Sequence, residues 1–431
     1  MKIFDWSELD SATRRQLLAR PALPGGEQFQ SQVNALISRV RNEGDAALLD
    51  LTRWLDGVAD PELEVRLENG PDIASELAAA IDEAGARIEA FHQAGKPDPV
   101  SMETAPGVTC QAIYRPIRRV GLYVPGGSAA LVSTLLMLAI PARVAGCQET
   151  VLCTPPNADG TISPAIRYAA QVNGIKRVFA VGGAQAVAAM AYGTQSIPRC
   201  DKIFGPGNAW VMAAKQQVAA SHAGCAIDMP AGPSEVLVIA DAQADPELVA
   251  LDLLAQAEHG PDSQVLLFSP SYELLQSVLS ELEVWTLKLP RRAILEQSLQ
   301  HARLIRVPDL ETGIELANGY APEHLILNTA DAGSWLDRVS NAGSVFLGRW
   351  TPETLGDYCS GANHVLPTYG YARSFSGLSV RDFSKRITVQ QATPEGLQAI
   401  GPCAVILAGA EQLDAHRQAV SRRLARLEEN P

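Results

Sequence analysis

The sequence lacks an excess of positive charge, a long apolar run and an export signal. Its 431 residues carry a net charge of −13, which argues against a nucleic-acid partner because phosphate backbones are bound by basic surfaces. The longest apolar run, residues 129–140, is too short to span a membrane and ends at Pro141. Acidic residues follow Met1 too early for a signal peptide, so we expect neither export nor a membrane partner.

Closely spaced cysteines are also missing. The seven cysteines include no Cys-x-x-Cys pair and do not suggest a disulfide framework, which favours a reducing, cytoplasmic location. Neither a Gly-x-Gly-x-x-Gly fingerprint nor a His-Glu-x-x-His zinc motif occurs. The remaining composition, 47% hydrophobic and 19% charged residues, is typical of folded proteins. At about 150 residues per domain, the length suggests two or three domains.

The N-terminal part is predicted to be helical. Residues 1–20 form a short amphipathic arm with too little apolar surface to fold alone, so we expect it to pack on another element or on a partner subunit. Residues 28–55 and 73–93 have apolar side chains at helical spacing, which predicts two scaffold helices. These side chains are Val33, Leu36, Ile37 and Val40 in the first helix and Leu77, Ile81 and Ile88 in the second.

From Arg119 onwards, short apolar runs alternate with helical segments, which predicts a parallel sheet with helical crossovers. The expected strands cover 120–124, 150–153, 177–181 and 202–204, and Gly-rich turns follow at 125–127, 182–185 and 205–208. Such turns suit a pyrophosphate, because free N–H groups at a helix N-terminus favour an anion. Turns between strands and helices are also Gly-rich for purely geometric reasons, so both interpretations stay open.

A second alternating unit begins at residue 235, so we expect two sheets in tandem. Its expected strands cover 235–240, 264–268, 304–307, 324–328 and 344–347, and its helices end at His259 or cover 272–299 and 313–319. The crossover between the two units, residues 229–234, is rich in Pro and Gly. We expect a ligand cleft beside this crossover, with Ser234 facing it.

Polar residues gather where the second unit changes from helix to strand. Gln256 and His259 are three residues apart, so on a helix they share one face, although a histidine at a helix C-terminus is often simply solvated. Glu323 and His324 stand directly before a strand, where a carboxylate and an imidazole could act as general acid and base. An exposed Glu-His dipeptide is as common as such a pair.

Further candidate ligands lie near the C-terminus. Residues 356–364 are expected to form a long loop that carries Asp357, Cys359 and His364, each a plausible metal ligand. Glu411 and His416 are expected on a C-terminal helix over 410–427, where a lone histidine is usually solvated. Side chains of these types suit a borderline cation such as Zn²⁺. The set with one amide oxygen, one carboxylate and two imidazoles is Gln256, His259, Asp357 and His416.

Six longer stretches together resemble the histidinol dehydrogenase family, in order from about Asp5 to the C-terminal helix. They read Gly-Leu-Tyr-Val-Pro-Gly-Gly, Phe-Gly-Pro-Gly-Asn, Asp-Met-Pro-Ala-Gly-Pro-Ser-Glu, Gln-Ala-Glu-His-Gly-Pro-Asp-Ser, Pro-Glu-His-Leu and Ser-Gly-Ala-Asn-His-Val-Leu-Pro-Thr. The resemblance implies a cytoplasmic enzyme of histidine biosynthesis, with NAD and one Zn²⁺ per subunit. Its reaction would be the oxidation of L-histidinol through L-histidinal to L-histidine.

The resemblance also implies roles for individual residues. The acid/base pair would be Glu323 and His324, and the zinc ligands Gln256, His259, Asp357 and His416. Substrate contacts would come from Ser234, Gln256, His259, His324, Asp357, Glu411 and His416, and NAD contacts from Tyr123, Gln185 and Asn208. Cys359 departs from the smaller side chain that we expect there, and we interpret it as an ordinary packed cysteine.

The fold implied by the resemblance is an α/β homodimer of two incomplete Rossmann-like domains with parallel sheets and small helical extensions at both termini. The arm covers 1–20, the first domain with its helical scaffold 21–118 and 234–378, and the second domain 119–233. The tail, 379–431, would exchange its helix with the partner subunit. Two other hypotheses are a zinc hydrolase that needs no NAD and a non-enzymatic two-domain binding protein.

Overall fold

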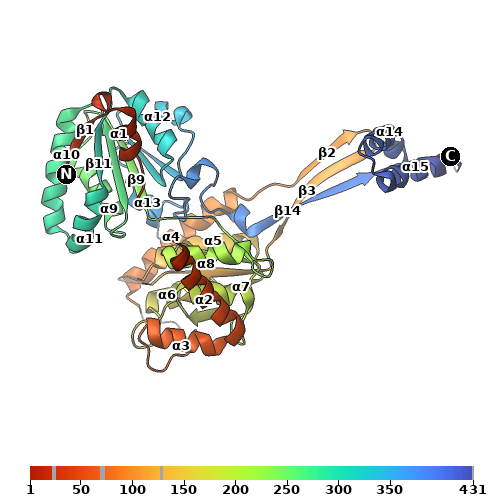
Figure 1. Ribbon diagram of the computed structural model, residues 1–431, viewed down its shortest axis with the longest axis horizontal. Coiled ribbons are helices and arrows are strands. Elements are labelled where there is room, and N and C mark those ends of the chain that lie inside the picture. Colours follow the sequence, from red (N-terminus) through yellow and green to blue (C-terminus); the bar gives the residue numbers. More distant parts are fainter. Residues whose placement is uncertain (22–25, 68–72, 127–129, 430–431) are drawn as a thin grey trace.

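The computed structural model describes residues 1–21, 26–67, 73–126 and 130–429. Figure 1 shows two α/β lobes and a long arm that ends in a pair of helices. Gly127, in the first of the expected Gly-rich turns, lies outside the described residues. Among those that are described, no helix is long and apolar enough to cross a membrane.

One lobe is built on a five-stranded parallel sheet in the order β6-β5-β4-β7-β8. Its strands are β4 (Arg119–Tyr123), β5 (Glu149–Thr154), β6 (Arg177–Ala180), β7 (Lys202–Phe204) and β8 (Ala226–Ile227). The chain reverses direction across the sheet at the central β4, and a ligand crevice is expected beyond the carboxyl ends of strands at such a point. Tyr123 ends β4 and Phe204 ends β7 at this place.

The helices of this lobe within the described ranges are α2 (Glu27–Glu43), α3 (Asp45–Leu55), α4 (Ser75–Ala94), α5 (Val132–Ala145), α6 (Pro164–Val172), α7 (Gly183–Tyr192) and α8 (Ala209–Ala220). The helix expected over 28–55 is two helices, because Gly44 takes a left-handed conformation (φ +61°) that separates α2 from α3. We expected these scaffold helices beside the segment 234–378. Instead, α2 packs on α7 and α4 on α5, so their apolar faces complete the core of the five-stranded lobe. The domain boundaries themselves stay a prediction.

The other lobe contains a six-stranded parallel sheet in the order β1-β11-β10-β9-β12-β13. Its strands are β1 (Ile3–Asp5), β9 (Glu235–Ala240), β10 (Gln264–Ser269), β11 (Arg303–Arg306), β12 (His324–Asn328) and β13 (Ser344–Leu347). Its helices are α1 (Ser11–Leu17), α9 (Pro246–Ala257), α10 (Tyr272–Lys288), α11 (Arg292–Ser298), α12 (Leu310–Tyr320) and α13 (Glu353–Tyr358). Every residue of β9, β10 and β12 is buried, because helices cover both faces of the sheet. The N-terminal arm packs as expected on another part of the chain, since β1 pairs with β11.

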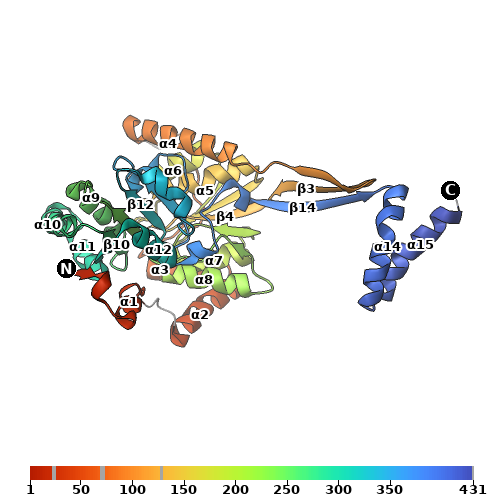
Figure 2. The same ribbon diagram turned by 90° about the horizontal axis from the view of Figure 1, so that it is seen from above.

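The arm in Figures 1 and 2 is an element that we did not expect, a three-stranded antiparallel sheet in the order β14-β3-β2. Its strands are β2 (Val100–Ala105), β3 (Val108–Pro116) and β14 (Ser384–Ala392), and the helices α14 (Pro394–Ala410) and α15 (Asp414–Glu429) follow. The α/β class with parallel sheets and helical extensions is confirmed. Short 3₁₀ helices cover Trp6–Glu8, Leu299–His301, Ala332–Arg338, Tyr371–Arg373 and Val380–Phe383.

The C-terminal helix expected over 410–427 is α15, which begins later, at Asp414, and a helix that we did not expect, α14, precedes it. Residues 393–402 begin α14 despite their Pro and Gly: the Thr393 side chain caps the helix and Pro394 occupies its first turn, where proline is tolerated. Glu411 therefore ends α14 rather than lying on the last helix, whereas His416 lies on α15.

Candidate active site

The amino edge of the six-stranded sheet holds the expected acid/base pair. Glu323 and His324 are 6% and 3% exposed, and His324 is the first residue of β12. As the sequence predicted, the pair lies at the start of a strand. In a parallel α/β unit the helices run opposite to the strands, so helix C-termini also arrive at this edge. The end of α9 brings Gln256 there, and the end of α13 brings Asp357.

The backbone N–H and carbonyl group of Glu235 contact the two members of the pair. Its N–H donates to Oε2 of Glu323 at 2.8 Å, and its carbonyl oxygen lies 3.2 Å from Nδ1 of His324. Because a carbonyl oxygen can only accept, Nδ1 of His324 carries the proton in this contact. The Nε2 atom then faces Asp357, whose Oδ1 lies 3.6 Å away. The carboxylate of Asp357 therefore favours a proton on Nε2 of His324 as well.

Burial raises the proton affinity of Glu323, and the neighbouring carboxylates raise that of His324. Burial raises the pKa of the Glu323 carboxyl. Burial alone would lower the pKa of His324, but the carboxylates of Glu323, Asp357 and Glu353 outweigh it and raise the pKa. Although burial opposes this, His324 lowers the pKa of Asp357 and keeps it ionised. Glu323 and His324 therefore hold a proton more tightly than the same groups in water, while Asp357 beside them stays ionised.

Gln256 and His259 converge on the same place. Gln256 is completely buried, its Nε2 lies 3.4 Å from Nδ1 of His259, and its Oε1 has no hydrogen-bond partner in the part of the chain that the structure describes. His259 lies two residues beyond the end of α9 and keeps access to solvent. Protein atoms nevertheless surround it closely enough to lower its pKa by burial, while the charge of Asp357 opposes that shift. An amide oxygen, an imidazole and a carboxylate are thus brought together.

Sequence reasoning missed Glu353, one helical turn before Asp357. It is 1% exposed, and neither carboxylate oxygen has a hydrogen-bond partner among the described residues. Burial raises its pKa well above the usual value, with His324 the nearest opposing charge. Asp252, one turn before Gln256 on α9, is its counterpart, and burial raises the pKa of that carboxyl to about 7. Asp252 lies four residues before Gln256, and Glu353 lies four residues before Asp357. This spacing, which places each acid on the same helix face as a candidate ligand, could have identified both acids from the sequence.

The region of the expected loop over 356–364 begins as helix, because α13 extends to Tyr358. Cys359 is the C-terminal cap of this helix, and residues two apart on a helix point in different directions, so it does not share the face of Asp357. His364 also faces elsewhere: its Nδ1 contacts the backbone oxygen of Asp357 at 2.7 Å, and its Nε2 lies 3.2 Å from Oγ1 of Thr134. Both ring nitrogens therefore already have protein partners.

The three expected NAD contacts line one pocket of about 1370 Å³ on the five-stranded lobe. Tyr123 and Gln185 are buried, and the Tyr123 hydroxyl accepts a hydrogen bond of 3.0 Å from the N–H of Gly183 at the start of α7. Asn208 caps α8, since its Oδ1 accepts from two N–H groups of the first turn. Among the residues that the structure describes, those lining this pocket all belong to the five-stranded lobe.

A buried ion pair holds the turn that carries Asn208. Lys215 and Asp228 form the pair, with both side chains only 1% exposed. Nζ of Lys215 donates to the carbonyl oxygen of Gly205, and Asp228 accepts from the N–H of the same residue, each at 2.8 Å. Gly205 has a φ of +122°, and a Cβ there would collide with the backbone oxygen of Tyr123. The turn therefore approaches β4 closely only because this position is glycine.

The remaining candidates differ in position. Ser234 is half-buried directly before β9, at the edge that carries Glu323 and His324. Glu411 and His416 are exposed and lie on the helical pair at the tip of the arm, far from β12 and α13 in both views (Figures 1 and 2). One chain thus brings together Gln256, His259, Glu323, His324 and Asp357 but does not bring the tail residues to them.

Comparison with known proteins shows strong similarity to histidinol dehydrogenases. The family model described as histidinol dehydrogenase matches residues 23–424. The chain belongs to the histidinol dehydrogenase family. Histidinol dehydrogenase of Xanthomonas euvesicatoria pv. vesicatoria (strain 85-10) is 56% identical over 98% of this chain and 99% of its own length. Histidinol dehydrogenase of Pectobacterium atrosepticum is 50% identical over 99% of this chain and 97% of its own length. The crystal structure of histidinol dehydrogenase from Elizabethkingia anophelis superimposes with a TM-score of 0.93, at 45% identity over 99% of this chain and 98% of that one.

Membership of the histidinol dehydrogenase family makes the chain an oxidoreductase, and the family's activity is the oxidation of histidinol in histidine biosynthesis. The hypotheses of a zinc hydrolase and of a non-enzymatic binding protein were therefore wrong. Neither rested on more than the metal-ligand types or the pair of lobes, features that a dehydrogenase shares.

The residues present fit part of a zinc site. The unpartnered, buried Oε1 of Gln256 together with His259 and Asp357 is a donor set suited to Zn²⁺. No group of three or more His, Cys, Asp or Glu side chains within the described ranges is placed to hold a metal by itself. An amide ligand is outside those four residue types, and a further imidazole would have to come from elsewhere.

Proposed function

We propose that the chain oxidises L-histidinol through L-histidinal to L-histidine, passing two hydrides in turn to NAD. The observation that supports this most directly is the buried Glu323–His324 pair beside Asp357, in a chain whose family is histidinol dehydrogenase. Each hydride transfer must be accompanied by loss of a proton, and the intermediate aldehyde must gain water. The reaction thus needs one base for hydroxyl protons and one group that activates water.

His324 takes the hydroxyl proton. Its Nδ1–H is held by the Glu235 carbonyl, so Nε2 is the atom that accepts the proton of the alcohol as the C–H bond gives its hydride to the cofactor. The same nitrogen accepts the proton of the hydrated aldehyde in the second oxidation. Asp357 at 3.6 Å stabilises the imidazolium that forms each time.

Glu323 activates the water that adds to the aldehyde. One of its oxygens accepts from the Glu235 N–H, which fixes the carboxyl in the buried site. Because burial raises its pKa, the carboxylate is a stronger base than a solvated glutamate, and it can accept a proton from water as the C–O bond forms. Its burial also keeps bulk water away from the aldehyde until this group delivers one molecule.

Zn²⁺ would be held by Gln256, His259, Asp357 and an imidazole of His416, and when bound it would orient the substrate's imidazole and amine. Ser234 and Glu411 would complete the contacts with L-histidinol. For NAD, the pocket on the five-stranded lobe supplies Tyr123, Gln185 and Asn208, and the start of α7 adds N–H groups suited to a pyrophosphate. Seven free cysteines are consistent with a cytoplasmic location.

The position of the tail supports a homodimer in which each site uses the partner's arm. Helix α14, which Glu411 ends, and helix α15, which carries His416, lie far from the two lobes within one chain (Figures 1 and 2). The arm also exposes apolar side chains that a monomer would leave in water, with Ile406 71% and Leu407 59% exposed on α14. A twofold dimer that exchanges the arms would bury them and bring His416 to the partner's zinc.

Mixing the protein with NAD and L-histidinol tests the proposal. We expect NADH absorbance to rise to two equivalents per histidinol, and a chelator to stop turnover without unfolding the lobes, because apolar side chains build their cores. Circular dichroism on the chelated sample serves as the control. Full turnover by metal-free, folded protein would contradict the zinc role, and absence of NADH with added zinc would contradict the function.

A further inference from the structure

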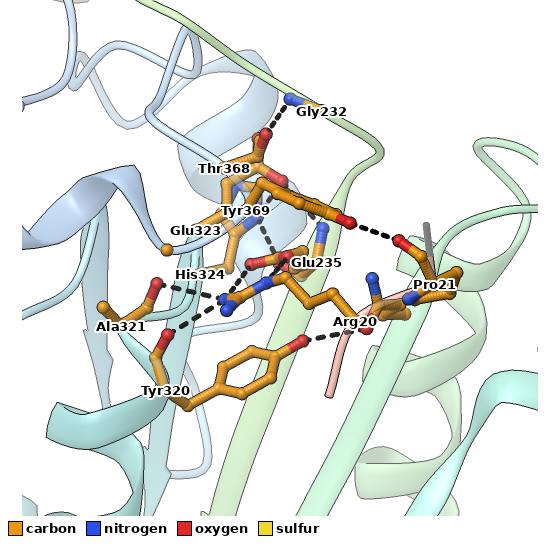
Figure 3. Close-up of polar contacts among 12 residues, drawn as sticks. Arg20, Pro21, Gly232, Glu235, Tyr320, Ala321, Glu323, His324, Thr368 and Tyr369 are labelled. Atoms are coloured by element: carbon orange, nitrogen blue, oxygen red, sulfur yellow. Dashed lines mark hydrogen bonds and ion pairs between the residues drawn. The ribbon is translucent and has the colours of Figure 1, made fainter. Parts of the chain in front are cut away.

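Glu235, whose peptide group contacts Glu323 and His324, also has a buried side chain with a partner of its own. The carboxylate is 0% exposed and forms a two-pronged ion pair with Arg20, in which Nη2 donates to Oε2 at 2.8 Å. Figure 3 shows the Arg20 guanidinium between this carboxylate and the carbonyl oxygens of Tyr320 and Ala321. Arg20 comes from the N-terminal arm, 215 residues away in the sequence.

Arg20 also holds the segment that leads into the acid/base pair. Its Nη2 donates to the carbonyl oxygens of Tyr320 at 3.0 Å and Ala321 at 3.4 Å, and its guanidinium lies 3.7 Å from the centre of the Tyr320 ring. Ala321 has a φ of +55°, a left-handed conformation that is strained for a residue with a side chain. Only Pro322 separates this residue from Glu323. One guanidinium thus contacts both segments that position the pair.

The surrounding contacts fix Arg20 in turn. The Tyr369 hydroxyl donates to the carbonyl oxygen of Pro21, and the Tyr369 ring lies 5.7 Å from the guanidinium (Figure 3). Thr368 beside it accepts from the N–H of Gly232, in the crossover between the two lobes. Burial raises the pKa of the Glu235 carboxyl, which Arg20 opposes, so without the guanidinium this carboxylate would be buried and uncompensated.

We propose that Arg20 and the Glu235 side chain are positioning residues for catalysis, which hold the Glu235 peptide and the strained 320–321 segment so that Glu323 and His324 keep their reactive geometry. The inference rests on the proposed acid/base roles of those two residues. An ion pair that only fixed the N-terminal arm to the six-stranded lobe would need no contact with Tyr320 or Ala321. Groups that orient reacting side chains in this way affect the rate of the chemical step rather than cofactor affinity.

The variant Arg20→Ala tests this, with Arg14→Ala as the matched control. Arg14 lies on the same arm and its guanidinium donates twice to the backbone oxygen of Trp6, without contact to Glu235. We expect Arg20→Ala to lower kcat by about 10- to 100-fold, the usual effect of losing an outer partner of an active site, and to leave KM for NAD unchanged. Arg14→Ala should keep both constants.

Guanidinium ion at millimolar concentration should restore part of the kcat of Arg20→Ala, and urea, of similar shape but neutral, should not. An equal loss of kcat in Arg20→Ala and Arg14→Ala, or equal effects of guanidinium and urea, would overturn the proposal. Arg20 would then only fix the N-terminal arm to the lobe. If Arg20→Ala does not fold, the double variant Arg20→Gln/Glu235→Gln removes the unpaired charge, and wild-type kcat in that protein would also overturn it. Full activity of His324→Asn would instead refute the proposed function itself.

Discussion

At the scale of single residues, the site is marked by buried polar groups. Gln256 and Glu353 have unpartnered oxygens among the described residues, whereas Glu323 and His324 each have a contact to the peptide of one neighbour, Glu235. Burying a polar group without a partner costs free energy, so such groups concentrate where ligands bind. The combination of held and unpartnered groups makes this edge of the sheet the candidate active site.

Glu323→Gln should impair the oxidation of L-histidinal more than that of L-histidinol, because only the aldehyde needs activated water. The amide oxygen of glutamine can still accept the Glu235 N–H, so the fold should be kept. Loss of a general base typically lowers the rate by about 10²- to 10⁴-fold, and we expect this for supplied histidinal. Single-turnover rates with each substrate measure the difference, and equal losses would contradict the division of labour.

His92 should make stability depend on pH. Burial lowers its pKa from 6.5 to about 4, with Asp382 opposing, so the folded state binds fewer protons than the unfolded state between these values. The stabilisation is complete above pH 6.5 and is lost as pH falls towards 4, by an amount of about 2–3 kcal/mol. Urea unfolding of His92→Gln at pH 7 and pH 4.5 should show a smaller decrease than the wild type. An identical decrease would show that His92 is not the cause.

Individual residues of the site could be predicted from the sequence only where they lie in stretches that resemble the family. Gln256, His259 and Asp357 lie close together, as a shared zinc site would require, although their roles as ligands stay predictions. Glu353 and Glu235 were missed because their positions beside His324 arise from tertiary contacts. In the sequence, Glu235 is only the first residue of an apolar strand, and nothing nearby indicates Arg20 as its partner.

At the scale of elements, the alternation of apolar runs and helices predicted both parallel sheets, and this is confirmed. The arm was missed because its strands do not have the buried face that sequence patterns detect. All but the first residue of β14 are exposed, and β2 is exposed over its first five residues. Their pairing with β3 is visible only in three dimensions, since β14 is more than 260 residues from it along the chain.

The cap of α8 gives a test of the nucleotide pocket. Since Oδ1 of Asn208 caps the helix, only its NH₂ group remains for a cofactor. Asn208→Asp should keep stability, because Asp caps as well as Asn, and should raise KM for NAD. Asn208→Ala should also lose about 1 kcal/mol of stability. Thermal unfolding and NAD kinetics measure both effects.

Ser271→Ala is the matched control for this cap. It removes the corresponding cap of α10, where Ser271 accepts from the N–H of Leu274, far from the pocket lining. We expect a similar loss of stability with no change in KM for NAD. If Asn208→Asp leaves that KM unchanged, Asn208 is a helix cap and nothing more.

At the scale of the whole molecule, the two lobes and the β2-β3-β14 arm carry different groups of candidate site residues. The six-stranded lobe holds the acid/base pair, the five-stranded lobe holds the pocket, and the arm carries His416 and Glu411 away from both (Figure 1). Sequence patterns could not give this distribution, since the tail's distance from the site depends on the unexpected antiparallel sheet. The central claim is that each active site combines the body of one subunit with the tail of another.

Mixing two inactive variants tests this claim most directly. His259→Asn damages the body and His416→Asn damages the tail, so with exchanged tails a mixed dimer has one site with both defects and one intact site. Random exchange makes about half of the dimers mixed, so about a quarter of wild-type activity should return. If verified subunit exchange restores no activity, each site is complete within one chain and the claim is wrong.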